Sequence, residues 1–298
     1  MKKQGWVKGW VKGWVKGWFQ GGIRCIRLRQ RFGLALVGFV GVLLFAACSP
    51  DQATSPTPAS PTDPAQPSVL RVAINPAFPP FEMKAADGSL TGFDIDLINA
   101  VGGTAGFIID FDEMVFDDLI RSIYGNQTDV AISAITINRD RAERVSFSRP
   151  YFKSGLAIAV AANNTDITSV QSLQGKRIGV QRSTTSEAQA QAIPNTKVRQ
   201  TASAPEALQA LAKGEVDAVI NDAPVTTYLI NSGAVPGLKL IAPPLTEEYY
   251  GIATPKDSPN LEKINAALTT LFNNGTYAQI YKKWFATEPP QLPETAPI

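Results

Sequence analysis

The chain has 298 residues, of which 44% are hydrophobic and 18% charged. That balance is ordinary for a globular protein with a substantial core, and the length suits one large domain or two smaller ones. The net charge of +2 hides an uneven distribution, because nine of the 28 basic residues and none of the 26 acidic residues fall in residues 1–47. The remainder carries a net charge of about −7, which argues against a nucleic-acid-binding surface.

Histidine is absent, and the only cysteines are Cys25 and Cys48. The chain beyond residue 48 therefore lacks the usual zinc ligands, a Cys–His nucleophile, a Ser-His-Asp triad and any internal disulfide. These absences exclude most common hydrolase mechanisms. We expect neither a metal nor another cofactor.

The first 47 residues have the features of a secretory signal. Residues 34–47 form a 14-residue apolar run after a basic segment. At 1.5 Å per residue a helix of that length is about 21 Å long, short of the roughly 30 Å hydrocarbon core of a bilayer. The run ends at Phe45-Ala46-Ala47-Cys48, which resembles the lipobox of bacterial lipoproteins, although Phe45 stands where Leu is usual. The resemblance implies lipidation of Cys48; an ordinary cleaved signal or an uncleaved short anchor are the alternatives. Residues 48–68, with six prolines, are predicted to form an extended tether.

Strand and helix patterns alternate from residue 69 to about 285, which predicts an α/β fold. Two lobes are favoured over one sheet of that size. Pro205 and Pro224 suit first turns of helices, and Gly102-Gly103 is expected to end the first helix. The predicted strands are 69–74, 107–111, 129–133, 156–161, 177–181, 217–221 and 249–254. The predicted helices are 94–101, 116–124, 185–192, 204–212, 223–231 and 259–284.

Five motifs occur in the order seen in the polar-amino-acid-binding proteins of ABC transporters, among which the glutamine-binding protein is the nearest relative that we can name. They are Ala77-Phe78-Pro79-Pro80-Phe81-Glu82; Gly92-Phe93-Asp94-Ile95-Asp96-Leu97; Ile135-Thr136-Ile137 with Arg141; Phe147-Ser148 with Pro150-Tyr151; and Asn274-Gly275-Thr276-Tyr277 continuing to Tyr281-Lys282-Lys283-Trp284-Phe285. The resemblance covers residues 69–288. It implies the type II periplasmic-binding-protein fold, with two α/β lobes joined by two crossing strands. Lobe one would be 69–154 with 249–288, lobe two 155–248, and 289–298 a tail.

The resemblance also implies a clamp for the ligand's main chain. Arg141 matches the arginine that binds the carboxylate, a role suited to its planar fork of donors. By composition alone Arg139 or Arg144 would serve equally. Asp222 matches the aspartate that binds the ammonium, yet an aspartate before a helix is equally a plain N-cap. Thr136 would offer its backbone N–H and hydroxyl, or be only a β-branched strand residue.

Other positions complete the expected site. Ser133 and Ala134 lie at a strand end, where open α/β sheets bind ligands, and Ala134 would offer its carbonyl to the ammonium. Thr184 and Thr185 begin a helix whose N–H groups suit a carboxylate. Phe78 and Phe116 match two aromatics that sandwich the ligand side chain, although phenylalanine is more often plain core.

Two departures bear on specificity. Asn75 and Gln181 stand where the glutamine-binding protein has an aspartate and a lysine. A cationic ligand would lack the carboxylate that offsets its desolvation. An anionic one would lack the lysine, unless Arg182 or Lys153 turned inward. We therefore expect a neutral polar side chain, with glutamine favoured.

The predicted function is that of an extracytoplasmic, lipid-anchored, monomeric protein. It would close two lobes around a free amino acid and deliver it to the permease of an ABC importer. One alternative is an enzyme of the same fold, similar to cyclohexadienyl dehydratase. Another is the ligand-sensing domain of a receptor or channel.

Overall fold

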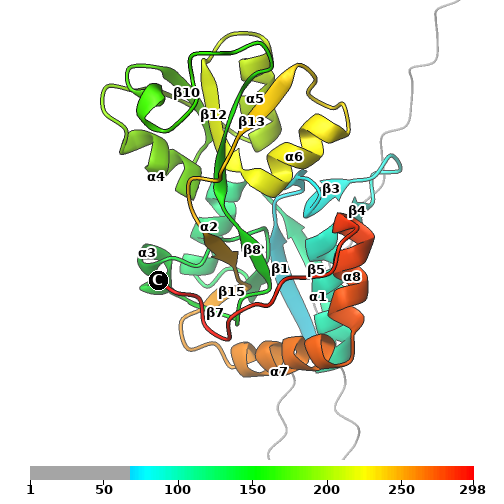
Figure 1. The fold of residues 1–298 in the computed structure, drawn as a ribbon. Helices are drawn as coiled ribbons and strands as arrows, with labels where there is room; N and C mark the ends of the chain where they lie inside the picture. Colours follow the sequence, from blue (N-terminus) through cyan, green and yellow to red (C-terminus); the bar gives the residue numbers. More distant parts are fainter. Residues whose placement is uncertain (1–67) are drawn as a thin grey trace, which may run out of the picture. The chain divides into compact units, whose positions relative to one another are not determined.

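The computed structural model describes residues 68–298. The predicted signal, the tether up to residue 67 and Cys48 lie outside the described residues. Within the described part, the chain forms two α/β lobes, each built on a five-stranded sheet (Figure 1). Two further strands connect the lobes, as the sequence predicted.

Lobe 1 is formed by the N-terminal part of the described chain together with strand β15 and the last two helices. Its strands are β1 (Ser68–Ile74), β2 (Ala77–Phe78), β3 (Glu82–Lys84), β4 (Leu90–Thr91), β5 (Phe107–Glu113), β6 (Val130–Ala131), β7 (Val145–Phe147) and β15 (Ala253–Pro255). Its helices are α1 (Phe93–Ala105), α2 (Phe116–Tyr124), α3 (Arg139–Ala142), α7 (Asn260–Asn273) and α8 (Thr276–Phe285). The main sheet has the order β5-β1-β6-β15-β7, with β1 parallel to β5 and β6. The carboxyl ends of β1 and β6 therefore lie side by side.

Lobe 2 has a second sheet, of order β11-β10-β12-β9-β13. Its strands are β9 (Leu156–Ala161), β10 (Arg177–Gln181), β11 (Lys197–Thr201), β12 (Ala218–Asp222) and β13 (Leu238–Ile241). Its helices are α4 (Thr185–Gln191), α5 (Ala204–Ala212) and α6 (Ala223–Asn231), with a 3-10 turn η1 (Gln171–Leu173). Pro205 and Pro224 lie in the first turns of α5 and α6, as predicted.

Some elements differ from the sequence expectation. Helix α1 continues through Gly102 and Gly103 to Ala105, and Gly106, at φ 77°, forms its cap. Gly102 serves packing instead, since a Cβ there would lie 2.7 Å from Ile109 Cδ1 on β5. The single helix expected over 259–284 is two helices, because Gly275 adopts φ 82° between α7 and α8.

Two strands of lobe 2 were not predicted. Both β11 and β13 are edges of the sheet. An edge strand is covered less than a central one, and β11 has the polar sequence KVRQT with no fully buried residue. Its pattern therefore lacks the apolar alternation from which strands are recognised.

The two connecting strands are β8 (Phe152–Ser154) and β14 (Glu248–Tyr250), which pair antiparallel. The sequence predicted one strand over 249–254, where the chain forms β14 in the connection and β15 in lobe 1. Phe152 and Tyr250 stack with ring centroids 5.6 Å apart, and Phe81 meets Phe152 edge-on at 4.8 Å. This aromatic packing fixes the connection against lobe 1, next to the motif that ends in Glu82.

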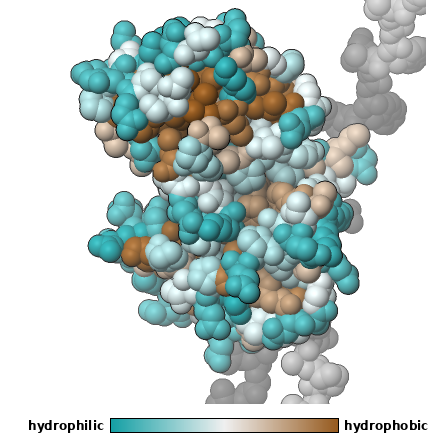
Figure 2. Space-filling view, viewed as in Figure 1, coloured by the Kyte–Doolittle hydropathy of each residue, from teal (hydrophilic) through white to brown (hydrophobic). Residues whose placement is uncertain are grey.

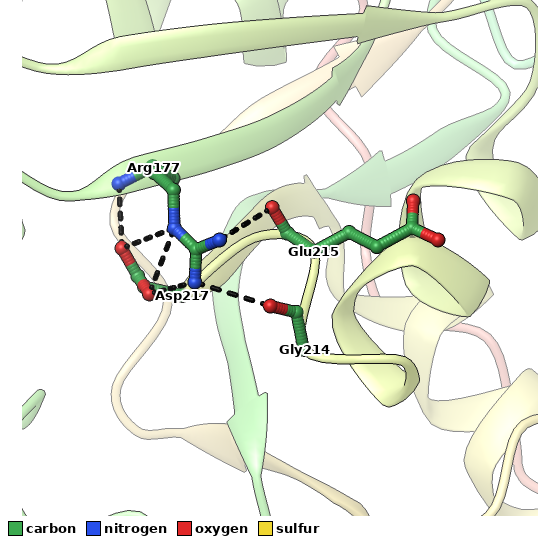
Figure 3. A network of polar contacts seen from close by, with 4 residues as sticks. All are labelled: Arg177, Gly214, Glu215 and Asp217. Carbon is green, nitrogen blue, oxygen red and sulfur yellow. Dashed lines mark hydrogen bonds and ion pairs between the residues drawn. The ribbon is translucent and has the colours of Figure 1, made fainter.

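Each lobe has an arginine that ties one strand to the loop entering its neighbour. At the start of β10, the backbone N–H of Arg177 donates to Asp217 Oδ2 over 2.8 Å, and its Nη2 donates to Oδ1 over 2.6 Å (Figure 3). In lobe 1 the backbone N–H of Arg71 donates to Asp129 Oδ2 over 2.9 Å, and Nη2 to Oδ1 over 3.1 Å. Solvent screens both of these exposed ion pairs, so each contributes little to stability. We assign both arginines a structural role.

On the face shown in Figure 2, apolar residues gather on lobe 2 around β13 and α6, whereas polar residues cover most of lobe 1. The chain beyond α8 packs back on lobe 1, where Ala296 is buried. None of the helices in residues 68–298 has the length and apolar character that crossing a bilayer requires.

Candidate functional site

A pocket lies between the lobes. All eleven residues that the sequence suggested for binding line it, together with two residues for which no role was predicted. The lining residues are Asn75, Phe78, Glu82, Phe116, Ser133, Ala134, Thr136, Arg141, Gln181, Thr184, Thr185, Asn221 and Asp222.

Arg141 is the member of its basic cluster that faces the pocket. It is 8% exposed, whereas Arg139 and Arg144 are exposed to solvent. Its backbone N–H donates to Asn138 Oδ1, the N-cap of α3, over 2.9 Å. Its Cζ lies 5.6 Å from the centre of the Phe116 ring, a cation–π distance. Burial lowers the pKa of Arg141, while Tyr124, Glu248 and Asp222 act in the opposite direction.

Asp222 is the last residue of β12, and its side chain makes no capping hydrogen bond to α6. Its Oδ2 instead accepts from the hydroxyl of Tyr250 on β14. Of the two roles open to it in the sequence, the cap is therefore absent. Burial raises the pKa of Asp222 to about 7, with Glu248 adding to the rise; Tyr250 and Arg141 oppose it.

Glu248 links both lobes to the connecting strands. Its Oε2 accepts from Thr136 Oγ1 at 2.7 Å and from Thr185 Oγ1 at 3.1 Å, and its Oε1 from Thr246 Oγ1 at 3.2 Å. The Thr136 hydroxyl, which the sequence suggested for the ligand, thus donates its proton to Glu248. Thr184 is the N-cap of α4, accepting from the Glu187 N–H at 3.2 Å.

The carboxyl ends of β1 and β6 form the lobe 1 wall. Ser133 Oγ donates to Glu82 Oε1 over 2.6 Å and accepts from the Asn75 N–H over 3.2 Å. Asn75 Nδ2 donates to the carbonyl of Met114 over 2.9 Å, and Asn75 Oδ1 has no donor among residues 68–298. Ala134 adopts φ 47°, a left-handed conformation that non-glycine residues rarely hold and that often marks functional sites.

Lobe 2 contributes Gln181 and Asn221 at the ends of neighbouring strands. Gln181 is 2% exposed, and its Nε2 donates to the carbonyl of Ala202 over 3.3 Å. Asn221 Nδ2 donates to Thr226 Oγ1 over 3.0 Å. Phe78 and Phe116 line the pocket at 8% and 7% exposure.

The position of Glu82 corrects the expectation that the pocket has no carboxylate for a cationic ligand side chain. A cationic ligand was expected to lack a carboxylate, because Asn75 replaces aspartate. Glu82 supplies one, fully buried, at the wall of the pocket. The motif Ala77–Glu82 contained it, but only its first aromatic was given a role. Neither Arg182, which is exposed, nor Lys153, which pairs with Glu247 at 2.7 Å, lines the pocket.

Among residues 68–298, no cluster of three or more His, Cys, Asp and Glu side chains could hold a metal ion. The polar groups of the pocket are a guanidinium, carboxylates, amides and hydroxyls. Such a set suits a small zwitterion with a polar side chain.

Comparisons of the sequence with known proteins find binding proteins for amino acids. A probable histidine-binding protein of Neisseria gonorrhoeae is 30% identical over 225 residues, which cover 74% of this chain and 84% of the relative. An arginine-binding periplasmic protein of Mannheimia haemolytica is 34% identical over 220 residues, covering 72% and 90%.

Solved structures similar to this chain are also amino-acid-binding proteins. An ancestral arginine-binding protein bound to arginine is 39% identical with a TM-score of 0.71, covering 74% of this chain and 99% of that one. A second structure, an ancestral arginine-binding protein bound to glutamine, is also 39% identical, with a TM-score of 0.68, and covers 74% of this chain and 99% of that one. The model of the bacterial extracellular solute-binding proteins, family 3, matches residues 70–287. The chain belongs to this family of bacterial extracellular solute-binding proteins and has its type II periplasmic-binding-protein fold.

Proposed function

We propose that the protein captures a free amino acid with a long, polar, donor-rich side chain, arginine before glutamine, and delivers it to an ABC importer. The observation that carries the proposal is the presence of Arg141 and Asp222 in one buried pocket, each contributed by a different lobe. A guanidinium and a carboxylate are the complements of an amino acid's carboxylate and ammonium. Ala134, at φ 47°, would add its carbonyl to the ammonium.

Charge and hydrogen-bonding capacity favour arginine over glutamine. The buried carboxyl of Glu82 would offset the desolvation of a guanidinium. Asn75 Oδ1 is a buried acceptor with no donor among residues 68–298, and leaving such a group unpaired costs about 1–3 kcal/mol until a ligand N–H occupies it. Relatives named for binding arginine and histidine agree with this choice. Phe78 and Phe116 would pack on the side chain.

Delivery depends on closure of the lobes. Lobe 1 would hold the ligand first, and lobe 2 would close over it with Asp222 and the residues at the start of α4. A ligand shifts such an equilibrium only by its differential affinity for the closed form. The closed, loaded, monomeric protein would then dock on the permease. We place one lobe boundary at residues 154–155, between β8 and β9, and the other at residues 248–249, within β14.

Calorimetric titration of the purified protein with the twenty amino acids tests this proposal. We expect arginine to bind tightest and glutamine measurably, with micromolar affinity corresponding to about −8 kcal/mol. Glu82→Gln should reverse the order of arginine and glutamine, while the matched variant Glu113→Gln, which changes an exposed carboxylate paired with Lys84, should not. No heat with any amino acid would overturn amino-acid capture. A tighter fit for glutamine in the unaltered protein would overturn only the side-chain assignment.

We also propose an extracytoplasmic location with a lipid anchor at Cys48, from the basic segment, the short apolar run and the small residues before the cysteine. Metabolic labelling with palmitate should mark the protein and not its Cys48→Ser variant. Equal labelling of both would place the lipid elsewhere, and no labelling of either would leave a cleaved signal or an uncleaved anchor.

A catalytic function is the second candidate, because Glu82 is a buried, protonatable carboxyl in the pocket. A dehydratase of this fold needs such an acid. Turnover of prephenate by the purified protein would support it, and binding of amino acids without turnover would exclude it.

A further inference from the structure

Asp94 is a fully buried carboxyl that lies directly behind the pocket without lining it. It belongs to the first turn of α1, and its Oδ2 accepts from the Ala134 N–H at 2.8 Å and from the Tyr151 hydroxyl at 2.9 Å. Glu82 Oε1 accepts from Ser133 Oγ at 2.6 Å. The adjacent residues Ser133 and Ala134 therefore hold two carboxyls beside each other.

The other two oxygens of this pair, Glu82 Oε2 and Asp94 Oδ1, have no donor among the described residues. The charge of Asp94 acts on the carboxyl of Glu82 and disfavours its ionisation. Two carboxyls buried beside each other do not both ionise readily, and a proton kept on one of them can be donated to the free oxygen of the other.

Within residues 68–298, no cationic side chain pairs with either carboxyl. The groups facing the pair are the hydroxyl of Tyr151, the Asp222–Tyr250 pair from lobe 2 and the connection, and, from α8, Tyr277, whose hydroxyl donates to the Tyr151 carbonyl over 2.7 Å. Arg141 donates to the carbonyls of Thr136 and Ser183, and Glu248 accepts from threonines. Burial raises the pKa of Asp94 to about 6. Burial also raises the pKa of Glu82 well above its ordinary value, and the nearby charges of Asp94 and Asp222 raise it further.

We propose that Glu82 and Asp94 form a proton-sharing pair whose charge adapts to the ligand, which makes Asp94 a positioning residue for specificity. A cationic side chain beside Glu82 stabilises the ionised pair, and the shared proton leaves to the buffer. A neutral side chain of the same shape leaves the proton in place. The inference rests on the proposed function, and it explains how one pocket accepts both cationic and neutral side chains.

A comparison of arginine with citrulline isolates the release of the shared proton from the other contributions to binding. Citrulline has a neutral group of nearly the same shape in place of the guanidinium. Calorimetry of the purified protein in two buffers of different ionisation enthalpy, from pH 5 to 8, counts the protons exchanged. We assign Asp222 to the ammonium, which both ligands share. Protons exchanged by Asp222 therefore cancel when the proton count for citrulline is subtracted from that for arginine. We expect arginine to release up to one proton more than citrulline. The preference for arginine should rise about tenfold per pH unit where the pair titrates.

Asp94→Asn replaces the shared proton with an amide donor and keeps acceptors for Ala134 and Tyr151. The difference in proton count should then shrink, because Asp94 no longer disfavours the ionisation of Glu82, while both ligands still bind. Asp96→Asn, on the exposed side of the same helix, should retain it. Equal proton counts for the two ligands in the unaltered protein, or an unchanged difference in Asp94→Asn, would overturn the inference and leave amino-acid capture intact. Failure of both ligands to bind the unaltered protein would overturn the proposed function together with it.

Infrared difference spectroscopy keeps the test independent of how well Asp94→Asn folds. The unaltered protein should show the band of a protonated carboxylic acid at neutral pH, and arginine should diminish it more than citrulline does, because the ionisation of Asp222 is common to both ligands. A spectrum without that band, or the same response to both ligands, would contradict a shared proton.

Discussion

Arg141 contacts Ser183 across the cleft between the lobes: Nη2 of Arg141, in lobe 1, donates to the carbonyl of Ser183, in lobe 2, over 3.2 Å. Nη1 of the same side chain donates to the Thr136 carbonyl over 3.0 Å. Ser183 adopts φ 60°, and its hydroxyl donates to Asp117 on α2. One buried guanidinium thus contacts both lobes. The group that we assign to the ligand carboxylate therefore also joins the two lobes to each other.

Arg141→Lys keeps the charge and loses the planar fork. We expect the affinity for every amino acid to fall about 10- to 100-fold, which corresponds to roughly 1.5–3 kcal/mol for a charge-assisted hydrogen bond. Calorimetric titration with arginine and glutamine measures it. Arg144→Lys, an exposed position over the Tyr124 ring, is the control and should bind normally. Unchanged affinity in Arg141→Lys would mean that another group holds the carboxylate.

Asn75→Asp places a second acid beside Glu82 and changes an unpaired acceptor into a charged one. We expect the ranking of ligands to move toward cationic amino acids, with arginine tighter and glutamine weaker by about tenfold each. Competition of the two ligands in one titration gives the ranking directly. An equal change for both ligands would show that Asn75 contacts the main chain and not the side chain.

The raised pKa of Asp222, about 7, predicts a pH dependence of binding. The ligand ammonium pairs with the ionised carboxylate, so affinity should be constant above about pH 7 and fall about tenfold per pH unit below it. Titrations from pH 5 to 8.5 test this for a neutral ligand. Asp222→Asn should bind weakly at every pH, with a flat profile; a sloping profile in that variant would assign the titration to another group.

The same shift has the opposite sign for the stability of the ligand-free protein. The folded state binds the proton of Asp222 more tightly than the unfolded state does. The protonated carboxyl therefore contributes its full stabilisation of the folded protein below about pH 4, and this stabilisation is lost as the pH rises to about 7. Urea unfolding of the unaltered protein should therefore show a falling free energy of unfolding over this range, relative to Asp222→Asn. A parallel pH dependence of the two proteins would contradict the raised pKa.

Glu248→Gln weakens a link between the lobes, since Glu248 accepts from Thr136 in lobe 1 and from Thr185 in lobe 2. We expect a smaller closed population and several-fold weaker binding of all amino acids, with little change in ranking. Small-angle scattering reports the closed fraction with and without arginine. Glu247→Gln, which alters an exposed partner of Lys153, is the matched control. Equal compaction by ligand in all three proteins would limit Glu248 to local packing.

The alternation of strand and helix patterns predicted an α/β fold, and the family resemblance named eleven residues that the structure brings to one pocket. Most of those residues, such as Asn75 after β1 and Thr185 at the start of α4, lie at a strand end or a helix start, where the local pattern marks them. Edge strand β11 was not predictable in the same way, since its polar residues carry no local signal of burial.

The sequence by itself determined the class of fold, and its family resemblance singled out Arg141 from its basic neighbours as the residue expected at the pocket. Only the tertiary structure decided that Asp222 forms no capping bond, that Glu82 lines the pocket, and that Asp94 lies behind it. The physical reason is distance along the chain. Glu82 and Ser133 are 51 residues apart, and Ala134 and Asp94 are 40 residues apart, so the hydrogen bonds that bring the two carboxyls together exist only once β1, β6 and α1 have packed.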